Sequence, residues 1–146
     1  MPAPHLSSLT DTLRLRSVVL GWSQLTVPLD DDSGAQHFVI RAAGTVVACG
    51  SSAPSPLPSP ELAGLRSIRF YGVAVIPEFQ NRGAGGAILT ALIADATQQA
   101  AGLLWANARV SALPFYLARG FRTVGERFSD PLSRLVDARV VLDLPR

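Results

Sequence analysis

The middle of the chain restricts the fold more than any other part. A β-prone run over 67–76 predicts a strand, in which Gly72 marks a bulge or the close approach of another backbone. Pro77 ends this strand because proline cannot donate a ladder hydrogen bond. Apolar residues at helical spacing then predict a long helix over 84–101, which Gly102 stops. A strand, a glycine-containing loop and a helix in succession indicate a mixed α/β fold.

The same rules of periodicity and turn chemistry predict the other elements. Further helices are expected over 9–22 and from a cap at Ser111 to Arg119. Further strands are expected over 37–40, 45–50, 103–107, 121–128 and 138–144. Residues 1–8 are expected to form a loose tail, and the proline-containing stretch 51–64 a loop. No first strand is evident before Leu9.

Composition indicates one globular domain over 1–146. About half of the chain, 48%, is apolar, which is enough for a core. Its positive charges are arginines spread along the chain, so no nucleic-acid partner is indicated. No apolar stretch is long enough to span a membrane and no signal peptide is evident, which predicts a cytoplasmic location. The histidines and Cys49 have no metal-ligand spacing, and Cys49 is expected to be a buried apolar residue.

The loop between the central strand and helix is a candidate site for an anion. The first backbone N–H groups of a helix have no partner within it, and the helix dipole is positive there. Gly83 and Gly85 leave the backbone uncovered, and Arg82 adds a positive charge. A turn that only needs flexible residues explains the same glycines, so the pattern alone leaves both explanations open. The spacing fits neither a P-loop nor a Gly-x-Gly-x-x-Gly motif.

Two blocks of the sequence are similar to one known family. The motif Gln80-Asn81-Arg82-Gly83-Ala84-Gly85 resembles the Gln/Arg-x-x-Gly-x-Gly/Ala signature of the GNAT superfamily of N-acetyltransferases. The block 104–121, which ends in Phe115-Tyr116-Leu117-Ala118-Arg119-Gly120-Phe121, is similar to that family's fifth strand and fourth helix. The resemblance implies a central, mostly antiparallel sheet flanked by helices, in which one parallel pair of strands splays apart.

The resemblance also implies that acetyl-CoA binds where the two parallel strands separate, here 70–76 and 103–107. An extended arm of the ligand would lie along the free edge of the first strand, like an added strand. For Asn107, a structural role in capping nearby backbone is an equal alternative. The implied cofactor contacts are Val73, Ala74, Val75, Gln80, Asn81, Arg82, Gly83, Ala84, Gly85, Gly86, Asn107 and Phe115.

The family's reaction is direct attack of an amine on the thioester. Tyr116 matches the tyrosine that protonates the leaving thiolate in many relatives; the alternative is an aromatic packing residue beside Phe115. The strand over 67–76 contains no acid, so the base is sought at Glu78 or Glu126, and both are also explained as surface carboxylates. The acidic run at 30–32 could attract an amine, although a solvated loop explains it too.

The function implied is transfer of an acetyl group from acetyl-CoA to a primary amine of a small molecule or peptide. The resemblance also allows a homodimer. No metal is expected, because the sequence has no Cys/His metal-ligand spacing. A non-catalytic acyl-CoA-binding or regulatory module of the same fold is the main alternative. A flavodoxin-like nucleotide-binding protein fits the strand order less well. Both ends of the chain depart from the family pattern, which leaves the acceptor amine open.

Overall fold

The computed structural model describes residues 2–62, 64–131 and 134–145. The strands are β1 His5–Ser7, β2 Gln36–Ala42, β3 Thr45–Pro54, β4 Ser67–Val75, β5 Leu103–Arg109, β6 Arg122–Ser129 and β7 Val136–Asp143. The helices are α1 Leu13–Val18, α2 Ala84–Gln98 and α3 Leu113–Leu117. Short 3-10 turns occupy Leu9–Thr12, Pro28–Asp31, Pro60–Leu62, Pro77–Phe79 and Val110–Ala112. Among the described residues, no helix is both long and apolar enough to cross a membrane.

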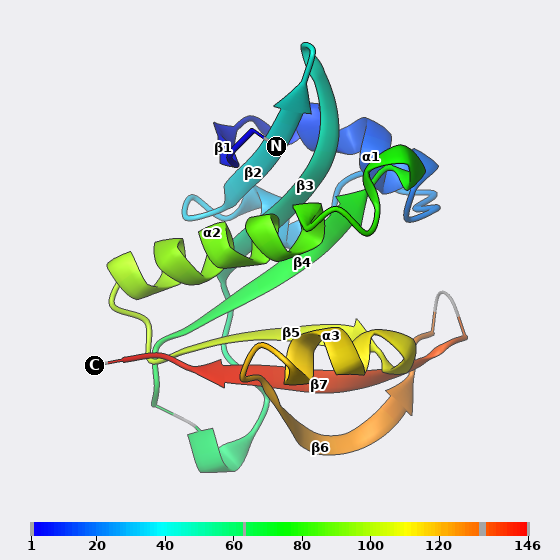
Figure 1. The fold of residues 1–146 in the computed structure, drawn as a ribbon. Helices are drawn as coiled ribbons and strands as arrows, with labels where there is room; N and C mark the ends of the chain where they lie inside the picture. The colour runs from blue at the N-terminus through cyan, green and yellow to red at the C-terminus, as the bar shows by residue number, and fades with distance from the viewer. Residues whose placement is uncertain (1, 63, 132–133, 146) are drawn as a thin grey trace.

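All seven strands form one sheet in the order β1-β2-β3-β4-β5-β7-β6. Every neighbouring pair is antiparallel except β4 and β5, which are parallel. Their pairing covers only Ser67 to Arg69 of β4 against Leu103 to Trp105 of β5. Beyond these residues the two strands diverge (Figure 1). The mixed α/β class, the mostly antiparallel sheet and the splayed parallel pair are therefore confirmed.

A bulge in β4 lies just beyond the point of divergence. Ser51 of β3 faces Tyr71, whereas Cys49 faces Ala74, so β4 carries one more residue than β3 between these pairs. Gly72 adopts φ +66°, a left-handed conformation that a side chain disfavours. The bulge predicted at Gly72 is confirmed, and it bends β4 where the strand leaves β5.

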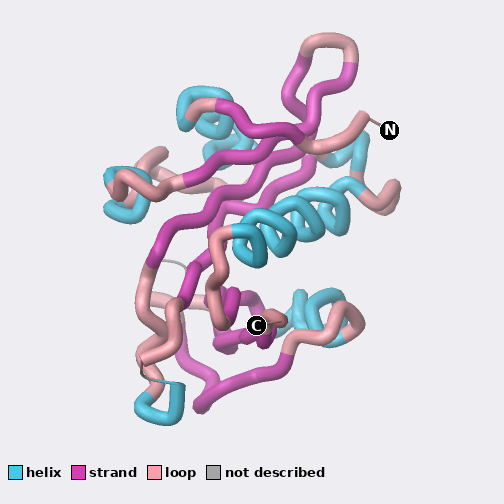
Figure 2. Tube along the Cα trace, turned by 90° about the vertical axis from the view of Figure 1, so that its left-hand side faces the viewer, coloured by secondary structure: helices cyan, strands magenta, loops and turns pink. Residues whose placement is uncertain are grey.

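Helices cover both faces of the sheet. Ile88 and Leu92 of α2 pack on Phe38, Phe70 and Leu104, together with residues of α3, in the largest core cluster. Figure 2 shows α2 lying along one side of the sheet. On the opposite face, Leu15 of α1 packs on Val39, Cys49 and Ala74. The prediction that Cys49 is a buried apolar residue is confirmed, since it is fully buried and unpaired.

The N-terminal prediction is wrong for residues 5–7. These residues form β1 rather than a loose tail, because their backbone pairs with β2, with His5 opposite Val39 and Ser7 opposite His37. The single helix expected over 9–22 is a 3-10 turn followed by α1, which ends at Val18. The chain then turns at Gly21, which has φ +69°.

Several other boundaries also differ. Ala100, with φ +59°, reverses the chain after α2, so the helix ends before Gly102. Gly102 instead donates its N–H to Arg66 O at 2.8 Å. The cap of α3 is Ala112 rather than Ser111, because α3 begins at Leu113, directly after the 3-10 turn over Val110–Ala112. Strand β3 extends to Pro54, into the expected loop.

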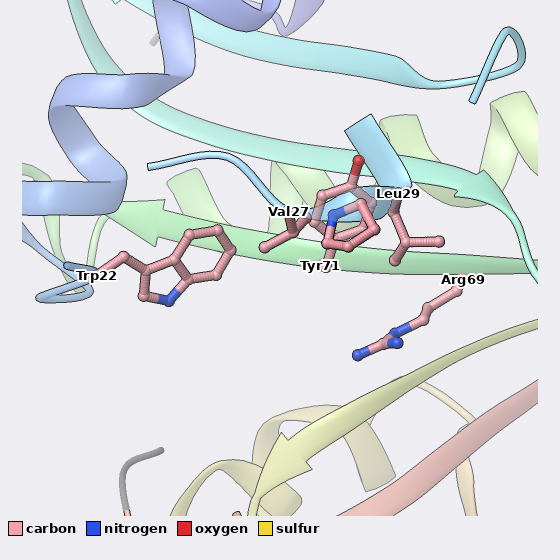
Figure 3. A pocket seen from close by; sticks show the side chains of 6 residues that line it. Trp22, Val27, Leu29, Arg69 and Tyr71 are labelled. Carbon is pink, nitrogen blue, oxygen red and sulfur yellow. The ribbon is translucent and has the colours of Figure 1, made fainter. Parts of the chain in front are cut away.

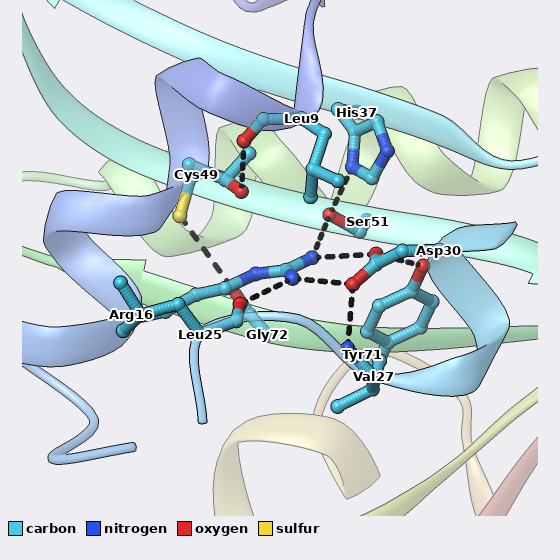
Figure 4. Close-up of polar contacts among 11 residues, drawn as sticks. Leu9, Arg16, Leu25, Val27, Asp30, His37, Cys49, Ser51, Tyr71 and Gly72 are labelled. Carbon is cyan, nitrogen blue, oxygen red and sulfur yellow. Dashed lines mark hydrogen bonds and ion pairs between the residues drawn. The ribbon is translucent and has the colours of Figure 1, made fainter. Parts of the chain in front are cut away.

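A buried ion pair joins α1 to the loop before β2. Arg16 and Asp30 have side chains that are 0% exposed, and Arg16 Nη1 lies 2.7 Å from Asp30 Oδ2. Arg16 also donates to Leu25 O at 2.9 Å, while Asp30 accepts from Val27 N at 2.8 Å and from Tyr71 Oη at 2.7 Å (Figure 4). Burial alone would raise the pKa of Asp30, but these hydrogen bonds hold the pKa below its ordinary value. Asp30 is therefore structural, which corrects the expectation of a solvated residue.

Replacing Asp30 should destabilise the fold strongly. Asp30→Asn keeps the shape of the side chain but leaves Arg16 as an uncompensated buried charge, which costs about 3–5 kcal/mol of unfolding free energy. Urea unfolding followed by circular dichroism measures this loss. Asp11→Asn is the matched control. Asp11 pairs with Arg41, but its side chain is 31% exposed, so this variant should lose far less unfolding free energy. Equal losses for the two variants would contradict this account.

Candidate active site

The separation of β4 from β5 opens a cavity of about 230 Å³. Its walls come from both strands and from the segments that cover the two faces of the sheet. They comprise Leu20, Trp22, Phe70, Tyr71, Gly72, Val73, Ala106, Asn107, Ala108, Arg109, Ala112 and Tyr116. We call this cavity the strand gap. Because β4 has no paired strand along the gap among the described residues, its backbone edge can accept an extended ligand.

The strand gap contains only part of the set of β4 residues predicted to touch a cofactor. Val73 lines it. Ala74 points to the other face of the sheet, where it is buried against Leu15 of α1. Val75 lies at the far end of β4, where its Cγ2 is 3.8 Å from the position that a Cβ on Gly85 would take. The strand thus leads from the gap to the start of α2.

The start of α2 presents unpaired backbone donors. The first helical hydrogen bond runs from Ala87 N–H to Gly83 O at 2.9 Å. The N–H groups of 84–86 come before it and have no helical carbonyl to bind. No side chain caps this end. Gln80 Nε2 donates to Val75 O at 3.0 Å, and Asn81 adopts φ +62°, so these two residues shape the loop. We call residues 80–86 the anion loop.

Two of the three glycines in the anion loop, Gly83 and Gly85, are explained by different physical constraints. Gly83 has φ +85°, a conformation that favours glycine by itself. At Gly85, an added Cβ would meet only Val75 and Phe115, at 3.8 and 3.9 Å, which is ordinary contact. Packing within the chain therefore does not require glycine at position 85, although glycine costs a helix about 1 kcal/mol relative to alanine. The packing of the described residues therefore gives no reason for glycine at this position.

Arg82 and Arg119 bring positive charge to the anion loop. Arg82 is exposed, with its Cζ 5.1 Å from the centre of the Phe79 ring. Arg119 lies over the Phe115 ring at 3.8 Å and donates to Phe115 O at 2.9 Å. Its Nη2 is 3.0 Å from the position of a Cβ on Gly86, so it flanks the first turn of α2. Arg119 is not among the predicted site residues, although its spacing of four residues from Phe115 predicts that the two side chains are neighbours on a helix.

Tyr116 combines both roles that the sequence leaves open. Its ring packs against Phe70, Phe115 and Phe121 at centroid distances of 5.7, 5.0 and 5.5 Å. It also lines the strand gap. Burial raises the pKa of Tyr116 to about 12, and the positive charge of Arg119 offsets only part of this rise. The aromatic packing therefore fixes a protonated hydroxyl group beside the gap.

Asn107 carries an unsatisfied acceptor in the strand gap. Its Oδ1 is buried and has no hydrogen-bond partner in the described part of the chain. Strand β5 continues to Arg109, so Asn107 does not end the strand as the capping alternative assumed. An unsatisfied buried acceptor costs about 1–3 kcal/mol, which a donor on a ligand would recover.

The structure does not bring the predicted bases to the strand gap. Glu78 lies in the 3-10 turn after β4 and Glu126 in β6, and both are exposed. Neither lines the gap. Asp130, the acidic residue that follows β6, lies 3.7 Å from Arg109 of the gap wall and forms an ion pair with it.

A second cavity, of about 350 Å³, lies beside the strand gap. Trp22, Val27, Pro28, Leu29, Arg69 and Tyr71 line it (Figure 3). Trp22 and Tyr71 also line the gap, so the two cavities share a wall. We call it the side cavity. No sequence pattern reveals this cavity, because its walls depend on how the buried Asp30 holds the loop before β2.

Comparisons with known proteins agree with this geometry. The sequence profile of the acetyltransferase (GNAT) domain matches residues 29–142, most of the chain. No curated protein matches the sequence.

Solved structures share the fold at low sequence identity. An N-acyl amino acid synthase from uncultured soil microbes superposes with a TM-score of 0.82 at 12% identity, over 99% of this chain and 96% of its own. An acyl-CoA N-acyltransferase from Pseudomonas aeruginosa gives 0.77 at 15% identity, over 97% and 99%. A GNAT family acetyltransferase from Elizabethkingia anophelis with acetyl-CoA bound gives 0.70 at 16% identity, over 97% of both chains.

Tyrosine ionisation tests the environment of the strand gap. Burial raises the pKa of Tyr116 to about 12, and burial together with the hydrogen bond to Asp30 raises the pKa of Tyr71. These are the only two tyrosines in the chain. At about pH 10, where exposed tyrosine is half ionised, tyrosinate absorbance should stay low in the folded protein and be high in urea.

The raised pKa values also set the direction of the pH effect on stability. The folded state holds these protons more tightly, so their contribution is complete below about pH 10 and is lost as the pH rises through the folded pKa values. A tyrosine that titrates near its ordinary value in the folded protein would show that the gap is open to water.

Proposed function

The chain belongs to the GNAT acetyltransferase family, and we propose that it transfers an acetyl group from acetyl-CoA to a primary amine of a small molecule or peptide. One observation carries the proposal: the unpaired N–H groups of 84–86 lie at the end of the same strand whose free edge borders the strand gap. A helix start of this kind suits a diphosphate, and a free strand edge suits an extended arm.

The residues present fit coenzyme A. The backbone of 83–86 would hold the diphosphate, with Arg82 and Arg119 as flanking cations. The unsatisfied Asn107 Oδ1 would accept an N–H of the pantetheine arm. Gly85 leaves space that the packing of the chain does not need. Bound acetyl-CoA would supply the activated thioester.

Tyr116 is the proposed general acid. Its raised pKa keeps the proton on the hydroxyl oxygen at neutral pH, and no hydrogen bond within the described residues contributes to that pKa. Its position in the wall of the strand gap makes this proton available to a leaving thiolate.

The proton of the amine is proposed to leave to water. Apart from the two tyrosines, the ionisable groups that line the two cavities are Arg69 and Arg109. Neither arginine can accept a proton, and Arg109 is already paired with Asp130 and Asp137, so water is the proton acceptor that the lining of the two cavities leaves. Glu78 or Glu126 would have to act from outside the cavities.

The names of two structural neighbours are consistent with an amine acceptor, namely an N-acyl amino acid synthase and an acyl-CoA N-acyltransferase. A cytoplasmic location, a homodimer and a single domain over 1–146 stay predictions from the sequence. A module that binds acyl-CoA without catalysis would bind coenzyme A and release no thiol over a panel of primary amines. Thiol release from acetyl-CoA therefore decides between the two.

Tyr116→Phe should slow the reaction without weakening cofactor binding. The variant keeps the aromatic packing but removes the proton donor, so kcat should fall by about 10²-fold. Thiol release measures kcat, and calorimetry with coenzyme A supplies the control for binding. An unchanged kcat would remove Tyr116 from the role of general acid.

Gly85→Ala should separate helix stability from cofactor binding. The methyl group suits the helix and should raise the unfolding free energy by up to about 1 kcal/mol. It would occupy the space assigned to the cofactor, so the Kd for coenzyme A should rise at least about 10-fold. Ala94→Gly, at an exposed position of the same helix, is the control: it should lower stability and leave Kd unchanged. Unchanged binding in Gly85→Ala would contradict the assignment of the anion loop.

A further inference from the structure

We propose that the acceptor amine carries a carboxylate, which Arg69 binds in the side cavity, and an apolar substituent that packs against Trp22, Val27 and Leu29. The inference rests on the proposed function and names the class of amine for the same site. It starts from a cation whose partner is missing from the described part of the chain.

Arg69 lines the side cavity without an ionic or hydrogen-bonding partner for its guanidinium group among the described residues. It is the last residue of β4 that pairs with β5, and its Cζ lies 5.1 Å from the centre of the Trp105 ring. Its Nε is buried and unsatisfied. No ion pair or hydrogen bond joins its guanidinium group to another described residue. A half-buried cation of this kind is stabilised by an anion.

Arg139 adds to the excess of positive charge. Its Cζ lies 5.7 Å from the centre of the same Trp105 ring, and its Nε is also buried and unsatisfied. Burial, and then the charge of Arg139, lower the pKa of Arg69. Two like charges near one aromatic ring, each with a free donor, favour a bound anion between or beside them.

The nearby carboxylates are already committed to other cations. Asp30 accepts from Arg16, and Asp137 lies 3.4 Å from Arg109. Because no ion pair joins Arg69 to a carboxylate of the described residues, we assign its anion to a ligand. A guanidinium group presents two parallel N–H donors, which match the two oxygens of a carboxylate.

The position of Arg69 relates the carboxylate to the reacting amine. Arg69 lies where the paired part of β4 and β5 ends, and the strand gap opens directly beyond it. Figure 3 shows its guanidinium group extending from β4 toward β5, below the apolar side chains of Trp22, Val27 and Leu29. A ligand held there by its carboxylate can reach the gap with an amine and leave an apolar group on these walls. An apolar amino acid has this arrangement of groups.

Binding of matched product-like ligands tests the inference without requiring turnover. N-acetylphenylalanine and N-acetylphenethylamine differ only in the carboxylate. Calorimetry should give a Kd for N-acetylphenylalanine that is about 10–100-fold lower, as expected for hydrogen bonds to a charged group. Equal affinities, or no binding of either ligand, would overturn the inference.

Variants identify the residue responsible. Arg69→Gln should remove the preference for the carboxylate, and Arg69→Lys should keep part of it, because lysine retains the charge and loses the paired donors. Arg127→Gln, an equal loss of charge at an exposed position of β6, is the control and should keep the full preference. Circular dichroism checks that each variant is folded. A preference that survives in folded Arg69→Gln would assign the carboxylate to another residue and overturn the inference.

Two readouts separate this inference from the proposed function. If coenzyme A binds and amines are acetylated, but a carboxylate on the ligand does not improve its affinity, only the proposed class of acceptor is wrong. If coenzyme A does not bind, the proposed function is wrong, and the ligand pair still decides whether Arg69 holds a carboxylate.

Discussion

The short parallel contact between β4 and β5 is the constraint on which the site depends. Pairing ends at Arg69 and Trp105, and the bulge at Gly72 then bends β4 away. Tyr116 borders the opening and packs its ring on Phe70. A continuous sheet would use these backbone groups for its own hydrogen bonds. The divergence leaves them for a ligand and directs the end of β4 to the start of α2, where further N–H groups are unpaired.

Two buried features give the two sides of the gap different chemistry. On one side, the aromatic cluster around Tyr116 partly buries the phenol and raises its pKa. On the other, the ion pair of Arg16 with Asp30 holds the loop that supplies Val27 and Leu29 to the side cavity. The first side suits proton donation, and the second suits selection of an acceptor. Loss of Asp30 should therefore affect acceptor binding as well as stability.

The sequence predicts the local part of this arrangement and misses the part made by distant contacts. The anion loop and α2 follow from glycine conformation, helix ends and periodicity, all of which act over a few residues. The strand β1 is missed because three residues carry no periodicity, and only pairing with β2 reveals them. The side cavity is missed because nothing near Asp30 in the sequence indicates that Arg16 will bury it. Arg119 lies within a matched motif, yet its role depends on how α3 docks beside Gly86.

A crystal structure with coenzyme A bound tests the central claim most directly. The account predicts that the N–H groups of 84–86 donate to the diphosphate and that the pantetheine arm lies between β4 and β5, with an N–H group on Asn107 Oδ1. Coenzyme A bound elsewhere on the protein, with the anion loop empty and the strand gap unchanged, would contradict it.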